Sequence, residues 1–220
     1  MTYDDLCRRI ESRDPFAFSR WGDGEWHAIL GRSGGNCDGH RYYPDMGEAL
    51  GHALVESASD PKHIKGLQPL AKDRMGDAIA EWEQEHNVSV YWHNADLIHD
   101  AAFEGRLDRF TAACGRMILV GPEHTAPIKA DHVYIPQRDA WTHREDILRR
   151  TGAAMLRSPS APVVLCCGML AEWLVWILRL MDPNRVIVDA GSVFDPWGGR
   201  RARTYQRQYD IVARNPGVAS

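Results

Sequence analysis

Hydrophobic and polar residues follow two different periods along the chain, and together these predict short strands separated by helices. Tyr3, Leu6, Cys7 and Ile10 recur at the spacing of a helix that buries one face. Residues 16–21 alternate instead, which favours a strand. Further strands are predicted at residues 63–67, 88–92, 116–121, 131–135, 163–167 and 186–188. Helices are predicted at residues 25–30, 48–57, 70–86 and 141–157, and in the apolar stretch that ends at residue 181.

The alternation of strands with helices predicts the fold class. Such an order is typical of an α/β protein, and residues 163–167 form a continuous apolar run of the kind that is buried on both faces of a parallel sheet. We therefore expect a Rossmann-like, doubly wound and mostly parallel sheet with helices on both faces. The chain of 220 residues is expected to form a single domain over residues 1–220, in which residues 196–220 are an arginine-rich C-terminal tail.

Composition narrows the class of protein. Hydrophobic residues make up 44% and charged residues 25% of the chain, as in ordinary globular proteins. The net charge of −4 gives no electrostatic reason to expect a nucleic-acid partner. The 5 cysteines have no C-x-x-C spacing, so neither a disulfide framework nor a zinc site is predicted. We expect a cytoplasmic protein, because the first residues lack the apolar core of a signal peptide.

One apolar stretch, residues 161–181, has the length of a membrane span. Pro162, Gly168, Glu172 and Arg179 interrupt it, whereas a span needs about 20 residues with few or no charges. We interpret it as a buried strand, a turn and a buried helix, so no transmembrane segment is predicted.

The most informative turn reads Arg20-Trp21-Gly22-Asp23-Gly24-Glu25. It places two carboxylates between a strand and a helix, at the edge of a parallel sheet where ligands bind and where helix N–H groups attract anions. Carboxylates alone would repel a phosphate, but Mg²⁺ or Mn²⁺ bound to Asp23 and Glu25 would remove that conflict. The alternative is structural: Asp23 is then the helix N-cap and Glu25 a first-turn acid favoured by the helix dipole.

Other candidate residues follow later strands. Gly168 opens a helix whose amides can bind phosphate or ribose oxygens, and Asp189-Ala190-Gly191-Ser192 is a similar turn, although glycine is also needed at such turns for steric reasons. Asp189, Asp139 and Asp195 are three rival candidates for a general base. Arg20 is either a second positive charge for a phosphate or a structural partner of Asp23. The tail residues Arg200, Arg201, Arg203, Tyr205, Arg207 and Tyr209 either form a solvated face or close over a phosphate-bearing ligand.

These motifs resemble a known family. The turn at residues 20–25 resembles the R-F-G-D-G-E signature of the GT-D-type glycosyltransferases, which were first catalogued as a domain of unknown function. Residues 135–141 followed by 146–148 resemble the family's I-x-P-x-x-N-A-F-x-x-x-D-E-I-L. Residues 163–168 resemble its strand-glycine-helix unit and residues 188–192 its D-x-G-[HS]. The resemblance covers about residues 3–195, with Asp139 in place of Asn, Met169 in place of Pro and Ser192 in place of a frequent His.

The resemblance implies a function. A glycosyltransferase of this kind moves a hexose from a nucleoside diphosphate sugar, most often UDP-linked, to a hydroxyl of a glycan or glycoconjugate acceptor. Asp23 and Glu25 would be the metal site for Mn²⁺ or Mg²⁺. The residues expected around the nucleotide sugar are Arg20, Gly22, Gly24, Gly168, Gly191 and Ser192.

Two alternatives remain open: a metal-dependent phosphohydrolase acting on a nucleotide or sugar phosphate, and a non-catalytic nucleotide-binding protein. A nicotinamide enzyme is disfavoured because the turn reads G-D-G-E rather than G-x-G-x-x-G. Self-association into a homo-oligomer is compatible with the sequence.

Overall fold

The sheet is the frame of the molecule. The computed structural model describes residues 1–36, 39–201, 203–208 and 210–219. Its strands are β1 (Phe16–Trp21), β2 (His63–Leu67), β3 (Trp92–Asn94), β4 (Ile118–Pro122), β5 (Asp131–Ile135), β6 (Val163–Leu165) and β7 (Val186–Asp189). They form one sheet in the order β3-β2-β1-β7-β6-β4-β5, and every neighbouring pair is parallel. The predicted α/β class with a parallel sheet is confirmed.

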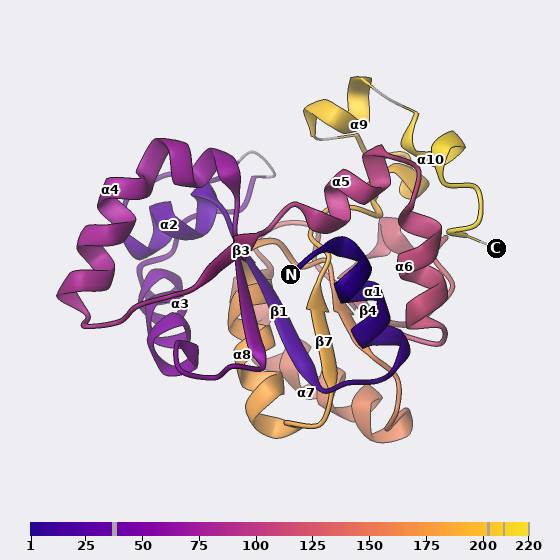
Figure 1. Cartoon of the computed structure of the whole chain (residues 1–220), viewed down its shortest axis with the longest axis horizontal. Helices are drawn as coiled ribbons and strands as arrows, with labels where there is room; N and C mark the ends of the chain where they lie inside the picture. The colour runs from indigo at the N-terminus through magenta and orange to yellow at the C-terminus, as the bar shows by residue number, and fades with distance from the viewer. Residues whose placement is uncertain (37–38, 202, 209, 220) are drawn as a thin grey trace.

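Helices cover both faces of this sheet (Figure 1). The α-helices are α1 (Tyr3–Glu11), α2 (Asp23–Ile29), α3 (Pro44–Ser57), α4 (Pro69–Glu85), α5 (Leu97–Phe103), α6 (Leu107–Cys114), α7 (Arg144–Arg157), α8 (Ala171–Met181), α9 (Thr204–Gln208) and α10 (Ile211–Arg214). Short 3₁₀ turns are η1 (Glu123–Thr125), η2 (Ala140–His143), η3 (Gly168–Leu170) and η4 (Asp195–Gly198). Helices α2, α3, α4, α7 and α8 lie on one face, and α1, α5, α6 and α10 on the other.

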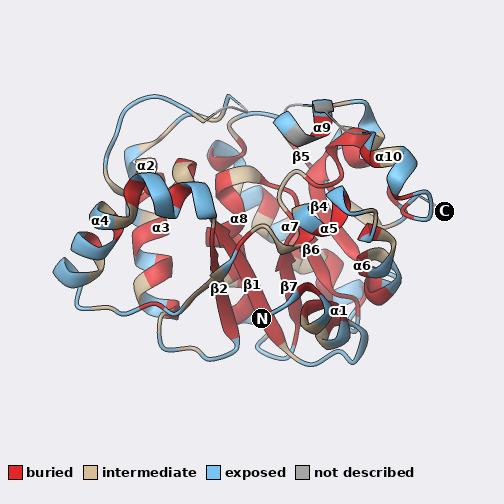
Figure 2. Ribbon diagram, turned by 45° about the horizontal axis from the view of Figure 1, so that its top comes forward, coloured by how far each residue is buried: buried red, intermediate tan, exposed pale blue. Residues whose placement is uncertain are grey.

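Two hydrophobic cores, one on each face, explain why β1 is central. Its alternate residues point to opposite faces: Ala17 and Trp21 enter the core under α2, α3 and α8, whereas Phe16 and Phe18 enter the core under α1 and α6. All six residues of β1 are buried, and Figure 2 shows the central strands as the most buried part of the molecule. The strand is therefore a rigid support for whatever follows its carboxyl end.

The predicted element boundaries hold to within about two residues, with three exceptions. Strand β3 was expected at residues 88–92, but it forms at 92–94 because these are the residues that pair with β2, with Trp92 opposite Lys65. Helix α3 begins at Pro44 rather than at residue 48, since proline is well accommodated in the first helical turn. The helix predicted at residues 141–157 starts as the 3₁₀ turn η2, so the α-helix α7 begins only at Arg144.

Two other observations concern the expected location and redox state. The described cysteines Cys7, Cys114, Cys166 and Cys167 are free thiols and buried, whereas Cys37 lies outside the described residues. Among the helices that the structure describes, none combines the length and the apolar character that crossing a bilayer requires.

The topology defines one special edge. From β1 the chain steps outward to β2 and β3, and β7 later returns to the opposite side of β1. In this order the connection that leaves β6 steps to β7, whereas the connection that leaves the adjacent β4 steps to β5 on the other side. Such a reversal creates a crevice at the carboxyl ends, which is where open α/β sheets bind ligands. The turns that follow β1 and β7 lie at the same carboxyl edge, because these two strands are parallel neighbours.

Candidate active site

A cavity of about 460 Å³ opens at the carboxyl ends of the central strands. The segments that follow β1, β2, β6 and β7 form its wall, together with α5, η1 and η4. This is the position expected from the strand order, and the volume lies within the range of small-molecule sites.

Most of the predicted site residues meet in this cavity. Those that line it are Arg20, Asp23, Gly24, Glu25, Gly168, Asp189, Gly191, Ser192 and Asp195. Gly22 and Asp139 do not line it. Gly22 precedes α2 as its N-cap, with an extended backbone. Asp139 precedes η2, where its Oδ1 accepts the Arg41 N–H at 3.1 Å, so the structure does not bring this candidate base into the cavity.

The acidic turn begins α2. Asp23 is the first helical residue and not the N-cap; its side chain is 46% exposed, and its Oδ2 lies 4.0 Å from Nη1 of Arg74. Glu25 Oε2 accepts the Gly22 N–H at 2.8 Å, as a capping carboxylate does. Glu25 therefore caps the helix start, which is a structural role. Asp23 makes no capping hydrogen bond and lies at the cavity.

A cluster of tryptophans fixes the position of this turn. Trp26 of α2 packs edge-to-face against Trp82, with ring centroids 5.6 Å apart, and against Trp92 at 6.1 Å. Trp21, the last residue of β1, also meets Trp92 edge-on. Trp21, Trp26 and Trp82 are buried and Trp92 is partly buried, so packing of these rings supports both the strand end and the helix start.

Arg20 is a buried hub beside the turn. Its Nε donates to the Ala95 carbonyl at 2.7 Å, and its Nη2 donates to Asp96 Oδ1 at 3.1 Å and to His99 Nδ1 at 2.7 Å. The structural partner of Arg20 is thus Asp96 rather than Asp23. Burial raises the pKa of Asp96, but the hydrogen bond with His99 and the Arg20 charge lower it overall to about 2. Burial, then the Arg20 charge, lowers the pKa of His99 to about 4, so this ring is neutral.

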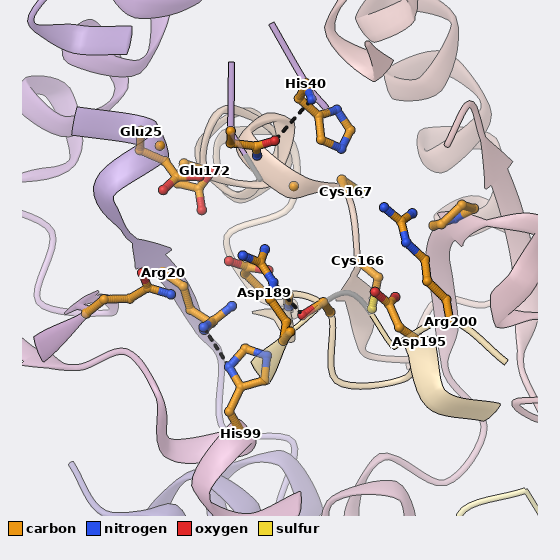
Figure 3. A pocket seen from close by; sticks show the side chains of 18 of the residues that line it. Arg20, Glu25, His40, His99, Cys166, Cys167, Glu172, Asp189, Asp195 and Arg200 are labelled. Carbon is orange, nitrogen blue, oxygen red and sulfur yellow. Dashed lines mark hydrogen bonds between the residues drawn. The ribbon is translucent and has the colours of Figure 1, made fainter. Parts of the chain in front are cut away.

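Three acidic side chains, Glu25, Glu172 and Asp189, lie on the wall around Arg20 (Figure 3). Burial raises the pKa of Glu25 to about 7, and burial followed by the charges of Glu25 and Asp189 raises the pKa of Glu172 well above its usual range. Glu172 accordingly keeps its proton. Its Oε2 is buried and has no hydrogen-bond partner among the described residues. Three carboxyl groups therefore surround the single guanidinium group of Arg20 in this part of the pocket.

This donor set suits a hard divalent cation in chemistry and charge. Oxygen ligands in carboxylate-rich surroundings match Mg²⁺ and Mn²⁺. Within the described ranges, no three or more His, Cys, Asp or Glu side chains are grouped so that they alone could hold a metal ion. Magnesium is commonly bound by one or two carboxylates together with water and substrate phosphates, so Asp23 and Glu25 fit the ion as a site that the substrate completes.

The two glycine turns allow close approach of the backbone. Gly168 and Gly191 both have φ of 58°, a left-handed conformation that favours glycine. A Cβ on Gly191 would lie 2.0 Å from Nη1 of Arg20, and the Gly191 N–H already donates to Asp189 Oδ1 at 2.8 Å. Packing therefore explains Gly191 directly, while its place on the cavity wall remains compatible with a ligand contact.

The arginine-rich tail reaches the same cavity. Arg200 and Arg203 line it, and Arg203 Nε donates to Ser192 Oγ at 3.4 Å. Arg201 is about half exposed, near Asp210. Tyr209 lies outside the described residues. The tail thus contributes positive charge opposite the acidic turn.

Several lining residues were missed by the sequence analysis as site residues: Asp96, His99, His124 and Glu172. Glu172 carried a weak signal, since it is a charge at the start of a strongly apolar helix. His124 carried another, because it follows a predicted strand. Nothing in the sequence marks Asp96 and His99 as partners of Arg20, because that cluster joins residues more than 70 positions apart.

No protein-family model matches the chain, and no curated protein matches it in sequence. Solved structures do match. The one described as a new glycosyltransferase (DUF1792) from Streptococcus sanguinis has a TM-score of 0.66 at 14% identity, over 88% of this chain and 81% of that one. Another is described as the highly conserved domain of unknown function 1792 with a distinct glycosyltransferase fold. It has a TM-score of 0.62 at 15% identity, over 88% and 78% of the two chains. The predicted resemblance is thereby confirmed for the fold: the chain has the glycosyltransferase fold of domain of unknown function 1792.

Proposed function

We propose that this protein is a glycosyltransferase that requires a divalent cation and moves a hexose from a nucleoside diphosphate sugar to a hydroxyl of a glycan or glycoconjugate. The observation that carries the proposal is the acidic turn at the start of α2, which faces a cavity at the carboxyl ends of the strands. The fold, shared with proteins described as glycosyltransferases, supports the same reaction class. A UDP-linked donor follows from the resemblance of the turn to the GT-D signature.

The residues divide into two groups with different tasks. Asp23 and Glu25 would hold Mn²⁺ or Mg²⁺, which supplies Lewis-acid stabilisation of a departing diphosphate. Arg200 and Arg203 line the cavity with guanidinium groups. A guanidinium group can donate two parallel hydrogen bonds to the oxygens of one phosphate. The Arg20 charge is locked by Asp96 and His99, so it acts on the site through its field rather than by moving to a ligand.

The charge balance of the pocket also favours metal-dependent binding. Glu25, Glu172 and Asp189 lie near a single buried guanidinium, and burial raises the pKa of each of them. A bound cation lowers the pKa of nearby carboxyl groups and lets them ionise. We therefore expect the nucleotide to bind tightly only when the cation is present.

The test is calorimetric titration of nucleoside diphosphates and their sugars in Mn²⁺, repeated with a chelator. The wild type is compared with Asp23→Asn and with the control Asp73→Asn, which alters an exposed aspartate of α4 away from the cavity. We expect Asp23→Asn to weaken binding roughly 10–100-fold, and Asp73→Asn to leave it unchanged. Sugar transfer to an acceptor panel is then measured for the same proteins.

Other outcomes would point elsewhere. Release of inorganic phosphate without a glycosyl acceptor would support the phosphohydrolase alternative. Nucleotide binding that ignores the chelator would support a non-catalytic binding protein. Metal-dependent turnover in a folded Asp23→Asn, Glu25→Gln double variant would contradict the assignment of the metal site.

A further inference from the structure

A histidine and an aspartate lie together on the cavity wall and have no part in the donor site described above. His124 belongs to η1, which follows β4, and Asp195 begins η4, which follows β7. His124 Nε2 lies 2.9 Å from Asp195 Oδ1, and both side chains are largely buried, with exposed fractions of 15% and 8%. Figure 3 shows Asp195 and Glu25 on opposite sides of the cavity, with Asp189 between them.

The contact with Asp195 determines which nitrogen of His124 carries the proton. An ionised carboxylate only accepts hydrogen bonds, so Nε2 of the neutral ring is the protonated nitrogen and Nδ1 holds a lone pair. Among the described residues, Nδ1 of His124 has no hydrogen-bond partner. An unpartnered atom is either buried or accessible, and Nδ1 is not one of the buried ones, so it is accessible. His124 therefore presents an accessible basic nitrogen at the cavity.

The rival groups are less suited to accept a proton. Asp189 Oδ1 is engaged by the Gly191 N–H, and burial raises the pKa of this carboxyl group. His99 Nδ1 accepts from the Arg20 guanidinium, which is a permanent donor. Asp139 lies outside the cavity wall. By contrast, the His124 ring is oriented by a carboxylate on one nitrogen and open on the other, as the base in a catalytic Asp-His pair is.

We propose that His124, oriented by Asp195, is the general base that deprotonates the acceptor hydroxyl, which makes His124 a catalytic residue and Asp195 a positioning residue. The inference rests on the proposed function. In the step, the acceptor oxygen forms a bond to the anomeric carbon while the bond from that carbon to the diphosphate oxygen breaks. The hydroxyl proton passes to Nδ1, and the nucleoside diphosphate leaves with the electron pair of the broken bond. Asp195 stabilises the imidazolium that results.

The placement fits the proposed donor site. A diphosphate bound at Asp23 and Glu25 would leave the sugar in the middle of the cavity, and the base would lie beyond it. Figure 3 shows two further ionisable side chains near Asp195: Arg200, just after η4, and Cys166, after β6. Glu123 precedes His124 in η1. Burial raises the pKa of Cys166 well above its usual range, so its thiol stays neutral. Arg200 therefore adds a positive charge near the carboxylate that orients the base.

A purely structural role is the competing explanation. The pair joins η1 to η4, and these turns are tightly packed, since a Cβ on Gly198 would lie 2.0 Å from the His124 carbonyl oxygen. The test must therefore include a readout that looser packing would not move. The dependence of kcat on pH is such a readout, because it reports the titration of the base in the enzyme-substrate complex.

The experiment compares the wild type with His124→Gln, Asp195→Asn and the control His143→Gln, which alters an exposed histidine of η2. Donor dissociation constants are measured by calorimetry in Mn²⁺, and kcat for transfer is measured from pH 5 to pH 9. We expect His124→Gln to lower kcat roughly 10²–10⁴-fold and to remove its inflection with pH, with donor affinity retained. Asp195→Asn should lower kcat in the same direction, because an amide can favour the wrong tautomer. His143→Gln should match the wild type.

The outcomes separate this inference from the proposed function. Unchanged kcat, or an unchanged pH inflection, in a His124→Gln variant that binds the donor would overturn the inference and leave the proposed function standing. A wild type that neither binds a nucleotide sugar nor transfers one would overturn both. Nitrogen NMR shifts of His124 give an independent check, since an Nδ1-protonated ring in the free protein would also overturn the assignment.

Discussion

His63, on β2, shows how one buried side chain makes stability depend on pH. The residue is 3% exposed, and its Nε2 lies 3.0 Å from Ser19 Oγ. Burial, then the charge of Lys65, lowers its pKa to about 3. An unfolded histidine titrates near pH 6.5, so between about pH 6.5 and pH 3 the unfolded chain binds one more proton than the folded chain. Stability due to His63 is complete above this window and is lost as the pH falls through it.

We expect this loss to be about 1.4 kcal/mol per pH unit below pH 6. Guanidinium unfolding at pH 7.5, 6.0 and 5.0 measures it, with His63→Gln beside the wild type and His143→Gln as the exposed control. As the pH falls, the free energy of unfolding of His63→Gln should decrease less steeply than that of the wild type. The difference between the two slopes should correspond to the uptake of about one proton. Equal slopes for His63→Gln and the wild type would contradict the origin assigned here.

Single residues also show how far the sequence alone could go. Asp23 and Glu25 were predicted because both lie in one turn, so their spacing and residue types can be read directly from the sequence. The pairing of His124 with Asp195 spans 71 positions and depends on how two turns pack, which no local pattern encodes. Arg20 was predicted as a site residue, but its partner was not, for the same reason.

Between elements, the close approach of α3 to α2 affects the site. Gly47 of α3 packs directly on α2, and a Cβ there would lie 2.1 Å from the Ala28 carbonyl oxygen. We expect Gly47→Ala to destabilise the fold by about 1–3 kcal/mol, because the backbones must separate. Since α2 also carries Asp23 and Glu25, donor affinity in Mn²⁺ should fall as well. Urea unfolding and calorimetry measure the two effects.

The matched control is Gly76 of α4. A Cβ at Gly76 would meet nothing within 4 Å, so Gly76→Ala should stabilise the helix by about 0.5–1 kcal/mol. Donor affinity should not change. A Gly47→Ala variant as stable as the wild type would show that α3 can shift at no cost, and the rigid placement of the acidic turn would then be in doubt.

Element boundaries were predictable where the local sequence determines them. Strand β1 and helix α4 have strong periodic patterns and form close to the predicted places. Strand β3 does not, because an edge strand extends only as far as its neighbour pairs with it, and the β-forming residues 88–91 lie before the first pair with β2. The strand order was likewise outside the reach of local patterns, since it depends on which buried faces pack together.

For the whole molecule, the cavity belongs to both halves of the sheet. One half supplies the turn after β1 and the start of α5, and the other supplies the turn after β7 together with η1 and η4. A nucleotide sugar held as proposed would contact both halves and slow local opening on each side of the sheet. The loops at the opposite edge, such as the residues between β2 and α3 and between α8 and β7, would be untouched.

We therefore predict the pattern of amide hydrogen exchange on binding of a nucleoside diphosphate sugar with Mn²⁺. Exchange should slow at residues 22–26, at 123–125 and at 189–195, and it should stay the same at residues 58–62 and 182–185, which lie at the amino ends of the strands. Because local opening is suppressed only where the ligand is bound, protection confined to the turn after β1 would mean that the donor occupies one half alone. In that case η1 would not approach the sugar, and its histidine would be too distant to act on the acceptor. Protection on both sides, lost again when a chelator removes the cation, would place the metal, the donor and the base within a single ligand-binding crevice.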